Sequence, residues 1–382
     1  MCFFPPGSLS LRSEILNASE SSAELIAHHF LIPAHHSESS ITEQLRTALR
    51  RSVPSGILTD YTILPTTACN ASCNYCYEKG CSIETMSEDT LHDLVDFIAA
   101  HRTTQAIRLH WFGGEPLMAS NVIDRICTEL NSRNIPFHST ITTNGSLFSP
   151  DLIEKAVALW KTEVVQITLD GLKEEYEAIK NYHTLESPYE LVHENIRRLL
   201  RSGIRVKLRL NFGQKNADSL FSLVEELNTR YSSESGLTVY VHPLFSTGVE
   251  TVSDDDPRLV LLRKKIATFF PSPPSPLPCL RVHHCMADRE DTVLVSPKGF
   301  LGKCEHYIEE DLGNVRSGFS NSPLLSRWQS HERSESCQQC PLFPSCISLP
   351  ACPESSPCSE FIRSNRLNKL QEQLQRMYKE QK

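Results

Sequence analysis

Short β-rich segments alternate with longer amphipathic segments between residues 61 and 242, and this alternation restricts the possible fold strongly. Six segments have strand character, at residues 61–64, 107–112, 137–142, 164–169, 206–210 and 238–242. Helical periodicity fills the intervals near residues 88–100, 121–131, 151–160, 189–202 and 218–227. Such alternation indicates a parallel sheet with right-handed crossovers. We expect an α/β fold, a partial (β/α)6 TIM-like barrel, because six units are too few to close a barrel of eight.

Capping residues mark several of these helices. Ser149 precedes a proline, which is a typical way for a helix to begin. Ser187, followed three residues later by Glu190, has the spacing of a capping box. Gly203 stands where a left-handed residue would end the fourth helix.

Cysteine is the unusual component of the composition, at 14 of 382 residues. The first residues lack the basic and apolar regions of a signal peptide, and no apolar run approaches the roughly 18–20 residues of a membrane span. We therefore expect a cytoplasmic protein, in which cysteines serve metal binding or redox chemistry rather than disulfides. The net charge of -8 argues against a broad nucleic-acid-binding surface. Neither nucleic acid nor membrane is expected as a partner.

The cysteines fall into two dense groups. Cys69, Cys73 and Cys76 follow the first predicted strand, at the edge of a parallel sheet where active sites lie. The proline-rich segment 271–278 predicts a stiff linker before the second group. That group consists of Cys279, Cys285, Cys304, Cys337, Cys340, Cys346, Cys352 and Cys358. Residues 279–358 have little regular pattern, so we expect metal ions rather than a hydrophobic core to stabilise them. Cys127 lies in a helical pattern and is interpreted as a core residue.

Three cysteines in one loop can bind three irons of a [4Fe–4S] cluster and leave the fourth iron open, which is typical of a catalytic metal centre. A zinc site is the alternative, and Cys81 is then the nearest candidate for a fourth ligand. Spacing alone leaves both possibilities open.

The segment Cys69-Asn70-Ala71-Ser72-Cys73-Asn74-Tyr75-Cys76 resembles the signature of radical S-adenosylmethionine enzymes. Further motifs similar to those of this family end the successive predicted strands, and together they cover residues 61–245. These are Gly113-Gly114-Glu115-Pro116, Thr143-Asn144-Gly145, Thr168-Leu169-Asp170-Gly171, and Arg209 with Asn211.

The resemblance implies a role for each of these residues. Gly113 and Gly114 would let the backbone approach the S-adenosylmethionine amino group, and Glu115 would orient that turn. The remaining candidates for binding the cofactor are Tyr75 near adenine, Asn144 at the neighbouring turn, Thr168 and Arg209 for the carboxylate, and Asp170 or Asn211 for the ribose.

The second cysteine group resembles the SPASM domain of radical peptide maturases. The resemblance implies two auxiliary [4Fe–4S] clusters in addition to the catalytic one. The first would be held by Cys279, Cys285, Cys304 and Cys352, and the second by Cys337, Cys340, Cys346 and Cys358. The five residues between Cys346 and Cys352 depart from the usual three, and a zinc knuckle at Cys337 and Cys340 is the alternative. His283, His284 and His306 are interpreted as polar neighbours of these sites rather than ligands.

Enzymes that this sequence resembles act mostly on ribosomally made precursor peptides and install thioether, ether or carbon–carbon crosslinks. The resemblance implies S-adenosylmethionine as cofactor and a reducing partner such as flavodoxin or ferredoxin. Oxidation of Cys or Ser to formylglycine, as in sulfatase maturases, is one alternative, and a non-catalytic iron–sulfur or zinc protein is another.

Four regions are expected along the chain. Residues 1–60 are interpreted as a short winged-helix-like element for peptide recognition or as a capping extension. Residues 61–270 would form the partial barrel, and residues 271–358 the cysteine-rich iron–sulfur domain. Residues 359–382 predict an exposed C-terminal helix.

Overall fold

The computed structural model describes Pro54, residues 56–244, 256–271, 285–308 and 310–329, and isolated positions at 40 and between 360 and 375. Within this part, eight strands form one sheet in the spatial order β6-β5-β4-β3-β2-β1-β7-β8. The strands from β6 to β7 are parallel, and β8 runs antiparallel to β7. They are β1 Asp60–Thr66, β2 Ile107–Gly113, β3 Phe137–Thr143, β4 Thr162–Leu169, β5 Arg205–Phe212, β6 Leu237–Pro243, β7 Thr292–Val295 and β8 Leu301–Gly302.

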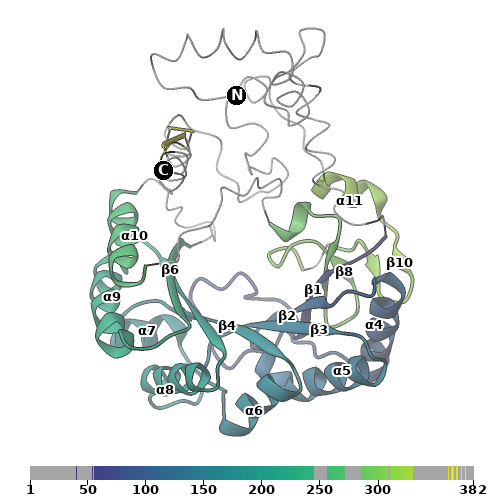
Figure 1. Cartoon of the computed structure of the whole chain (residues 1–382), viewed down its shortest axis with the longest axis horizontal. Helices are drawn as coiled ribbons and strands as arrows, with labels where there is room; N and C mark the ends of the chain where they lie inside the picture. Colours follow the sequence, from purple (N-terminus) through teal and green to yellow (C-terminus); the bar gives the residue numbers. More distant parts are fainter. Residues whose placement is uncertain are drawn as a thin grey trace, which may run out of the picture.

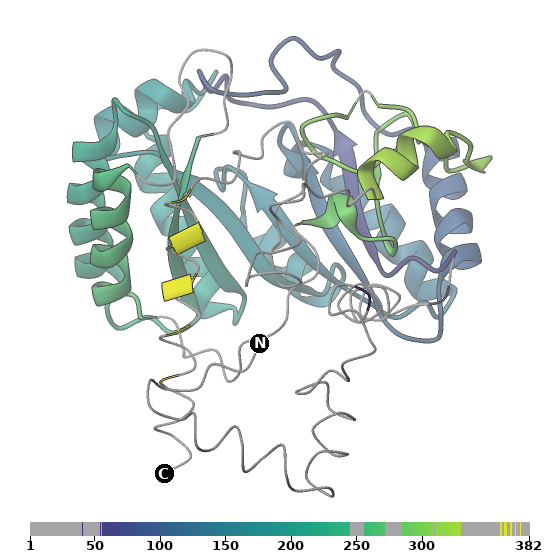
Figure 2. The same ribbon diagram turned by 90° about the horizontal axis from the view of Figure 1, so that it is seen from above.

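Helices lie along the outer side of the curved sheet (Figure 1). Seen from above, the strands spread between a blue and a green group of helices, and the sheet ends at β6 and β8 without closing (Figure 2). The helices are α4 Glu88–His101, α5 Ser120–Ser132, α6 Pro150–Ala158, α7 Lys173–Lys180, α8 Pro188–Arg201, α9 Ala217–Tyr231, α10 Pro257–Phe269 and α11 Ser322–Gln329. The short elements are the 3-10 turns η1 Pro116–Ala119 and η2 Met286–Asp288, and the strand pair β9 Gly313–Asn314 and β10 Gly318–Phe319.

The predicted α/β fold with an open barrel is confirmed, and all six predicted strands and five predicted helices are present. Ser149 caps α6 by accepting a hydrogen bond from the Leu152 amide, and Gly203 adopts the left-handed conformation with φ +87°. The capping box predicted for α8 is wrong. The Ser187 side chain makes no cap hydrogen bond, and Glu190 instead pairs with both terminal nitrogens of Arg230 on α9 at 3.0 Å.

The core lies between the sheet and its outer helices. Strand side chains that point outward, such as Ile63, Trp111 and Val165, are fully buried against the apolar faces of α4, α5 and α6. Cys127 is also fully buried there, as expected of a core residue. Burial on the outer face leaves the polar residues of alternate positions to line the inner face.

Residues 285–329 differ from the expectation of a segment without a core. All four residues of β7 are buried, and Val293 and Val295 belong to the same core as the barrel. Strand β7 pairs in parallel with β1, so it extends the barrel sheet by strands that the sequence analysis did not identify. Four consecutive apolar or β-branched residues buried on both faces show no alternation, which is why the periodicity missed them.

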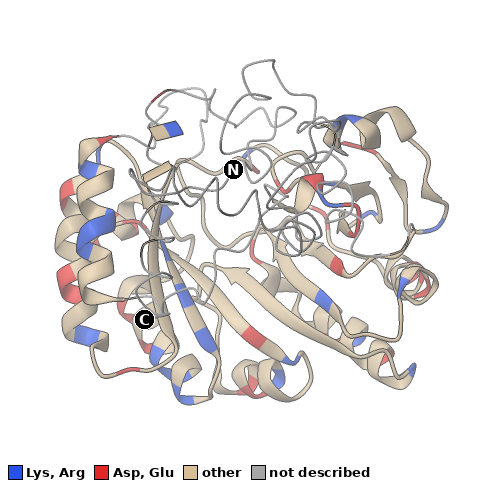
Figure 3. Cartoon of the chain, turned by 45° about the horizontal axis from the view of Figure 1, so that its top comes forward, with Lys and Arg blue, Asp and Glu red and all other residues tan. Residues whose placement is uncertain are grey.

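Charged side chains of both signs are interspersed on the outer helices (Figure 3). Lys265 of α10 pairs with Glu225 of α9 at 2.5 Å, which joins two neighbouring helices. Among the described residues, no helix combines the length and the apolar character that crossing a bilayer requires.

Several predictions fall outside the described residues. They are the winged-helix-like element of residues 1–60 apart from positions 40, 54 and 56–60, the linker 271–278 beyond its first residue, His283, His284, and Cys279, Cys337, Cys340, Cys346, Cys352 and Cys358. Of the predicted C-terminal helix, seven isolated positions between 360 and 375 are described, and these are helical.

Candidate active site

The loop that carries Cys69, Cys73 and Cys76 leaves the carboxyl end of β1 and lies on the C-terminal end of α7. The Ser72 amide donates to the Lys180 carbonyl at 3.0 Å, and the Asn74 amide donates to the Ile179 carbonyl at 3.3 Å. The His183 amide donates back to the Asn70 carbonyl at 3.1 Å. The first two bonds satisfy carbonyls that the end of a helix leaves unpaired, and all three fix the loop backbone between its cysteines.

The three thiols are partly buried, and none of the described cysteines forms a disulfide. Burial raises the pKa of Cys69 to about 12, and Glu115, Cys73 and Cys76 raise it further by their charge. Their mutual influence indicates that the thiols face a common region. Thiols in such surroundings stay protonated unless a metal ion takes the place of the proton.

Among the described residues, no three His, Cys, Asp or Glu side chains are grouped tightly enough to hold one metal ion. A [4Fe–4S] cube binds each cysteine through a different iron, so its ligands stand farther apart than those of a mononuclear zinc site. Three thiols on a fixed loop fit the donor set of the cube better than that of zinc.

The turn after β2 packs directly against this loop. Gly113 has φ +113°, and a Cβ atom on it would lie 2.3 Å from the Thr66 carbonyl oxygen. A Cβ atom on Gly114 would lie 2.4 Å from the carbonyl oxygen of Thr67. The Glu115 amide donates to the Ala68 carbonyl at 2.8 Å. Only glycine therefore permits this approach of two backbones at the start of the cysteine loop.

Glu115 joins the ends of β2 and β3. Its fully buried carboxylate accepts hydrogen bonds from the Thr143 hydroxyl at 2.7 Å, the Asn144 amide at 2.8 Å and the Leu117 amide at 3.2 Å. Burial raises the pKa of Glu115 to about 7, although these bonds oppose the shift. The Asn144 side chain in turn donates to the Asn70 side-chain oxygen at 2.7 Å, which connects β3 to the cysteine loop.

A buried polar network joins the ends of β4 and β5 to the same loop. Asp170 is fully buried, and one of its oxygens accepts hydrogen bonds from the Tyr75 hydroxyl and the Lys180 ammonium, both at 2.9 Å. Its other oxygen accepts from the Asn211 side chain at 2.9 Å. Lys180 also donates to the hydroxyls of Tyr75 at 2.9 Å and Thr168 at 2.6 Å. Tyr75, just before Cys76, is thus held by both strand ends.

Arg209 occupies the partly buried position beside this network. Its Nε donates to the Asn211 side-chain oxygen at 2.9 Å, and its guanidinium lies 3.4 Å from Nδ1 of His242 on β6. The residues that the sequence analysis selected at five strand ends are therefore brought to one edge of the sheet. Thr168 and Arg209 are the more accessible ones, whereas Asp170 and Asn211 are buried.

Polar side chains also cross the inner face of the sheet from β2 to β6. His110 lies 3.6 Å from the Glu305 carboxylate and 2.8 Å from the Thr142 hydroxyl. The Tyr240 hydroxyl donates to the Gln166 side-chain oxygen at 2.7 Å. Burial raises the pKa of Glu305 to about 7 and lowers that of His110 to about 4, so His110 is neutral and Glu305 is only partly ionised near neutral pH.

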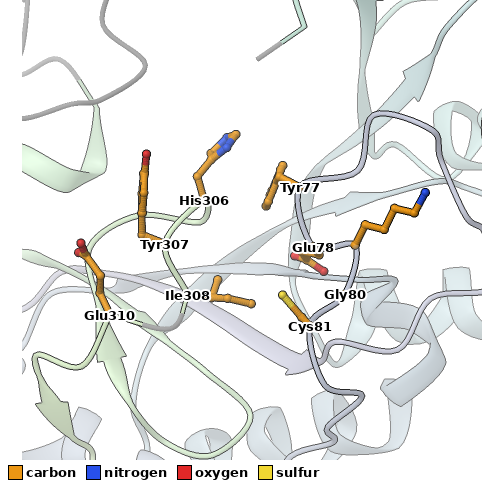
Figure 4. A pocket seen from close by; sticks show the side chains of 9 residues that line it. Tyr77, Glu78, Gly80, Cys81, His306, Tyr307, Ile308 and Glu310 are labelled. Carbon is orange, nitrogen blue, oxygen red and sulfur yellow. The ribbon is translucent and has the colours of Figure 1, made fainter. Parts of the chain in front are cut away.

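A cavity of about 540 Å³ lies between the segment after Cys76 and the segment after Cys304. Tyr77 and His306 meet at its rim, where their rings stack with centroids 4.0 Å apart (Figure 4). Glu78 and Cys81 point into the space between the two segments (Figure 4). Residues 306–308 and Glu310 therefore form one wall of the region next to the cysteine loop.

Cys285 and Cys304 are the two described members of the second cysteine group. The Cys285 thiol accepts a hydrogen bond from the Ala287 amide at 3.4 Å, and Cys304 packs on the cluster of Ala287 and Trp328. Both thiols thus border the same small cluster, about 20 residues apart in the chain.

Sequence reasoning missed several residues of this region, above all Asn70, Lys180, His110 and Glu305. Lys180 stands in none of the motifs that the sequence analysis used, and its partners Asp170 and Tyr75 are 10 and 105 residues away. His110 and Glu305 come together only because residues 285–308 return to the barrel.

Comparison with known proteins also indicates the α/β fold of an open barrel. Residues 63–224 match the model of the radical SAM superfamily. An uncharacterized protein of Methanocaldococcus jannaschii is 30% identical over 110 residues, which are 28% of this chain and 37% of that protein. The match thus spans little more than a third of that relative.

Two solved proteins illustrate the structural similarity. The structure of anSMEcpe with bound AdoMet has a TM-score of 0.60 at 16% identity and covers 78% of this chain and 91% of its own. Streptococcus suis SuiB bound to precursor peptide SuiA has a TM-score of 0.56 at 12% identity, with 89% and 85% covered. At these identities the likeness concerns the fold.

Proposed function

We propose that the chain is a radical S-adenosylmethionine enzyme that modifies a ribosomally made precursor peptide, because residues 63–224 match the model of the radical SAM superfamily. One observation carries the proposal. The three-cysteine loop and the motifs at the ends of β2, β3, β4 and β5 meet at a single edge of the sheet, joined by direct hydrogen bonds. This edge is where enzymes with parallel α/β sheets place their active sites.

The cysteine loop would hold the catalytic cluster through Cys69, Cys73 and Cys76, leaving one iron for S-adenosylmethionine. When bound, the cluster supplies the electron that splits the sulfonium into methionine and a 5′-deoxyadenosyl radical, which removes a hydrogen atom from the substrate. The chain contributes the position of the ligands, because α7 and the turn at Gly113 and Gly114 fix the loop backbone from two sides.

The cofactor would lie across the strand ends. The accessible Thr168 hydroxyl and Arg209 guanidinium are proposed to bind its carboxylate, and the backbone at Gly113 and Gly114 its amino group. Glu115 and Asn144 would act by fixing these turns. Asn211 and Asp170 are proposed to position the ribose side, with Tyr75 next to adenine. Because the oxygens of Asp170 already accept bonds from Lys180, Tyr75 and Asn211, it would act through them.

A peptide is the proposed substrate. Solved proteins of similar fold include anSMEcpe with bound AdoMet and Cp18Cys peptide, with a TM-score of 0.56 at 15% identity, and SuiB with its precursor peptide. The polar inner face between His110 and Tyr240 offers hydrogen-bonding groups to a peptide backbone. The proposed product is a thioether, ether or carbon–carbon crosslink, and the electron donor is a flavodoxin or ferredoxin.

The second cysteine group is proposed to form a SPASM-type domain with two auxiliary [4Fe–4S] clusters. The meeting of Cys285 and Cys304 at one small cluster supports a shared site. Their position beside Glu305 and His306 supports a site next to the inner face of the barrel. Electrons left by oxidation of a substrate radical would find an acceptor there.

The proposal is tested on anaerobically prepared protein reduced with dithionite in the presence of S-adenosylmethionine. The wild type should contain iron and acid-labile sulfide and release 5′-deoxyadenosine. Replacing Cys69, Cys73 and Cys76 together by alanine should abolish the release. The matched control is Cys127→Ala, a cysteine of the helical core that should leave release intact. Zinc without sulfide in the wild type, or cleavage by the triple variant, would overturn the proposal.

The peptide part is tested by co-expression with candidate precursor peptides and mass spectrometry of the product. A crosslink removes two hydrogens and leaves no aldehyde. Formylglycine formation would instead give a product that reacts with an aldehyde reagent. That result would contradict the proposed crosslink and support formylglycine as the product. Deoxyadenosine release without any peptide product from any precursor would contradict the proposed substrate class while keeping the enzyme class.

A further inference from the structure

Lys180 is held against the cysteine loop at both of its ends. Its carbonyl accepts the amide hydrogen of Ser72, which lies between Cys69 and Cys73. Its ammonium bonds the hydroxyl of Tyr75, the residue before Cys76, and lies 5.5 Å from the centre of that ring. The side chain is 3% exposed. Lys180 is therefore a buried, fixed cation beneath the loop.

The charge of Lys180 acts electrostatically on the cysteine thiols of the loop. Burial by itself would lower its pKa, but Asp170, Tyr75 and Cys73 raise the pKa of Lys180 well above the ordinary value, so it stays protonated. Burial raises the pKa of Cys76, and Lys180 is among the groups that oppose this shift. Asp170 compensates the ammonium from the opposite side, where Asn211 holds its second oxygen.

Burying an ammonium costs desolvation free energy, and a residue that only anchors the loop does not require a charge. An ion pair of this kind can often be replaced by apolar side chains without loss of stability. The backbone bond to Ser72 would anchor the loop with any residue at this position. The charge of Lys180 is therefore expected to have a function of its own. A nearby cation stabilises the reduced form of a metal cluster, because reduction adds a negative charge.

We infer that Lys180 is a positioning residue whose fixed positive charge raises the reduction potential of the cluster held by Cys69, Cys73 and Cys76. The inference rests on the proposed function, since it requires that cluster. The ammonium stabilises the reduced form relative to the oxidised form, so the cluster accepts its electron from a physiological donor more readily. The same side chain sets the orientation of Tyr75 through the bond between its ammonium and the tyrosine hydroxyl.

The test is a redox titration of the full-length, cluster-loaded protein followed by electron paramagnetic resonance. The catalytic cluster is recognised by the change of its signal on addition of S-adenosylmethionine. In Lys180→Met the ratio of reduced to oxidised cluster at a fixed potential should fall roughly tenfold, which corresponds to about 59 mV for a one-electron couple. Lys180→Arg keeps the charge and should retain the wild-type potential.

Asp170→Asn gives the opposite sign and serves as the matched variant. It removes the negative charge beside the ammonium, so the potential should rise in a titration run at a pH low enough to keep Lys180 protonated without Asp170. If Lys180→Met loses its cluster, the potential is measured instead in the double variant Asp170→Asn/Lys180→Met. This variant contains no unpaired buried charge from the pair of Lys180 and Asp170. It should have a lower potential than the wild type, because Lys180, and not Asp170, is among the charged groups that act on the Cys76 thiol.

The inference would be overturned if Lys180→Met had the same reduction potential as the wild type. If Lys180→Met lost its cluster, the same potential in the double variant and the wild type would overturn it. The inference would also be overturned if the potential fell in all three variants, Lys180→Met, Lys180→Arg and Asp170→Asn. Such a result would indicate a purely structural role, which does not depend on the sign of the charge. A wild-type protein without any signal that responds to S-adenosylmethionine would instead refute the proposed function. The two failures are thus distinguishable.

Discussion

Glu115 shows how one buried side chain can fix two strand ends. All three of its hydrogen-bond donors, from Leu117, Thr143 and Asn144, are neutral groups. Such a carboxylate accepts hydrogen bonds on both of its oxygens, whereas a side-chain amide accepts on one oxygen and presents a donor at the other position. The orientation of the Asn144 turn, and through it Asn70 of the cysteine loop, depends on this one residue.

Replacing Glu115 by Gln should lower the free energy of unfolding by about 1–3 kcal/mol, because the new amide group faces N–H or O–H donors without an acceptor. The measurement is urea denaturation of the two proteins side by side. Glu163→Gln is the control, since Glu163 is half exposed and pairs with Arg205 at 3.4 Å on the surface. That change should stay within about 0.5 kcal/mol. Equal stability of both variants would contradict the role given to Glu115.

Gly114 makes a second prediction at the scale of one residue. In Gly114→Ala the new methyl group would lie 2.4 and 2.5 Å from the carbonyl oxygens of Thr67 and Ala68, so the backbone of the cysteine loop must move. We expect loss of iron from the catalytic loop and of deoxyadenosine release, with the helical content unchanged. Gly213→Ala is the matched control, because its methyl group meets the flexible tip of Leu244 at 3.2 Å and the Asn216 side-chain oxygen at an ordinary 3.6 Å, and no backbone atom. Full iron content in Gly114→Ala would contradict the steric argument.

Sequence reasoning found the residues of the site that lie in short motifs, but not those that act from a distance. Cys69, Gly114 and Glu115 were found because each stands in a motif at a predicted strand end. Lys180 was not assigned a role, since a lysine at the end of a charged helix is usually exposed. Only the fold shows that it turns inward to meet Asp170.

Between helices α8 and α9, His193 and Tyr231 form a buried contact. Nδ1 of His193 lies 2.7 Å from the Tyr231 hydroxyl, and its Nε2 has no partner among the described residues. Burial lowers the pKa of His193 to about 3, and the nearby arginines Arg230 and Arg197 lower it further. The histidine is therefore neutral in the folded protein over most of the acidic range.

This contact predicts a pH dependence of stability. The folded pKa of His193, about 3, lies below the unfolded value of about 6.5, so the unfolded state binds the proton first as the pH falls. The stabilisation is complete above pH 6.5 and is lost progressively toward pH 3. Between pH 7 and pH 5 the wild type should lose about 2 kcal/mol more than His193→Gln in urea denaturation.

Tyr231→Phe is the control for this measurement. It removes the hydrogen bond but leaves the titrating ring in place, so it should cost about 1 kcal/mol at both pH values. A parallel decline of wild type and His193→Gln with falling pH would show that His193 is not buried as described.

The regular part of the barrel could be predicted at the scale of elements, whereas three kinds of element could not. Helix α7 is short and densely charged, and its only buried side chains are Tyr176 and Lys180. Helix α10 has a weak apolar stripe of Leu259, Leu262 and Ile266. Strand β7 pairs with β1 across more than 220 residues of chain, and no local pattern encodes such a distance.

At the scale of the whole molecule, the barrel and the segment after it share one sheet. Strand β7 covers the edge of β1, where Tyr61 and Ile63 are almost fully buried. Arg289, just before β7, reaches Asp60 of β1 at 2.9 Å and Asp291 at 2.6 Å. The expected boundary at residues 270 and 271 therefore does not separate two independent cores within the described part of the chain.

A chain that ends at residue 271 should consequently fail to fold as a soluble barrel. Removing β7 withdraws the buried Val293 and Val295, each contributing about 1.5–3 kcal/mol, from a total stability that is commonly 5–15 kcal/mol. It also exposes the hydrogen-bonding edge of β1, and a long apolar edge strand promotes aggregation. The matched control ends at residue 329 and retains β7, β8 and α11. Soluble yield, circular dichroism and size-exclusion chromatography compare the two, and a soluble, cooperatively unfolding chain of residues 1–271 would show that the barrel is stable without the segment that follows it.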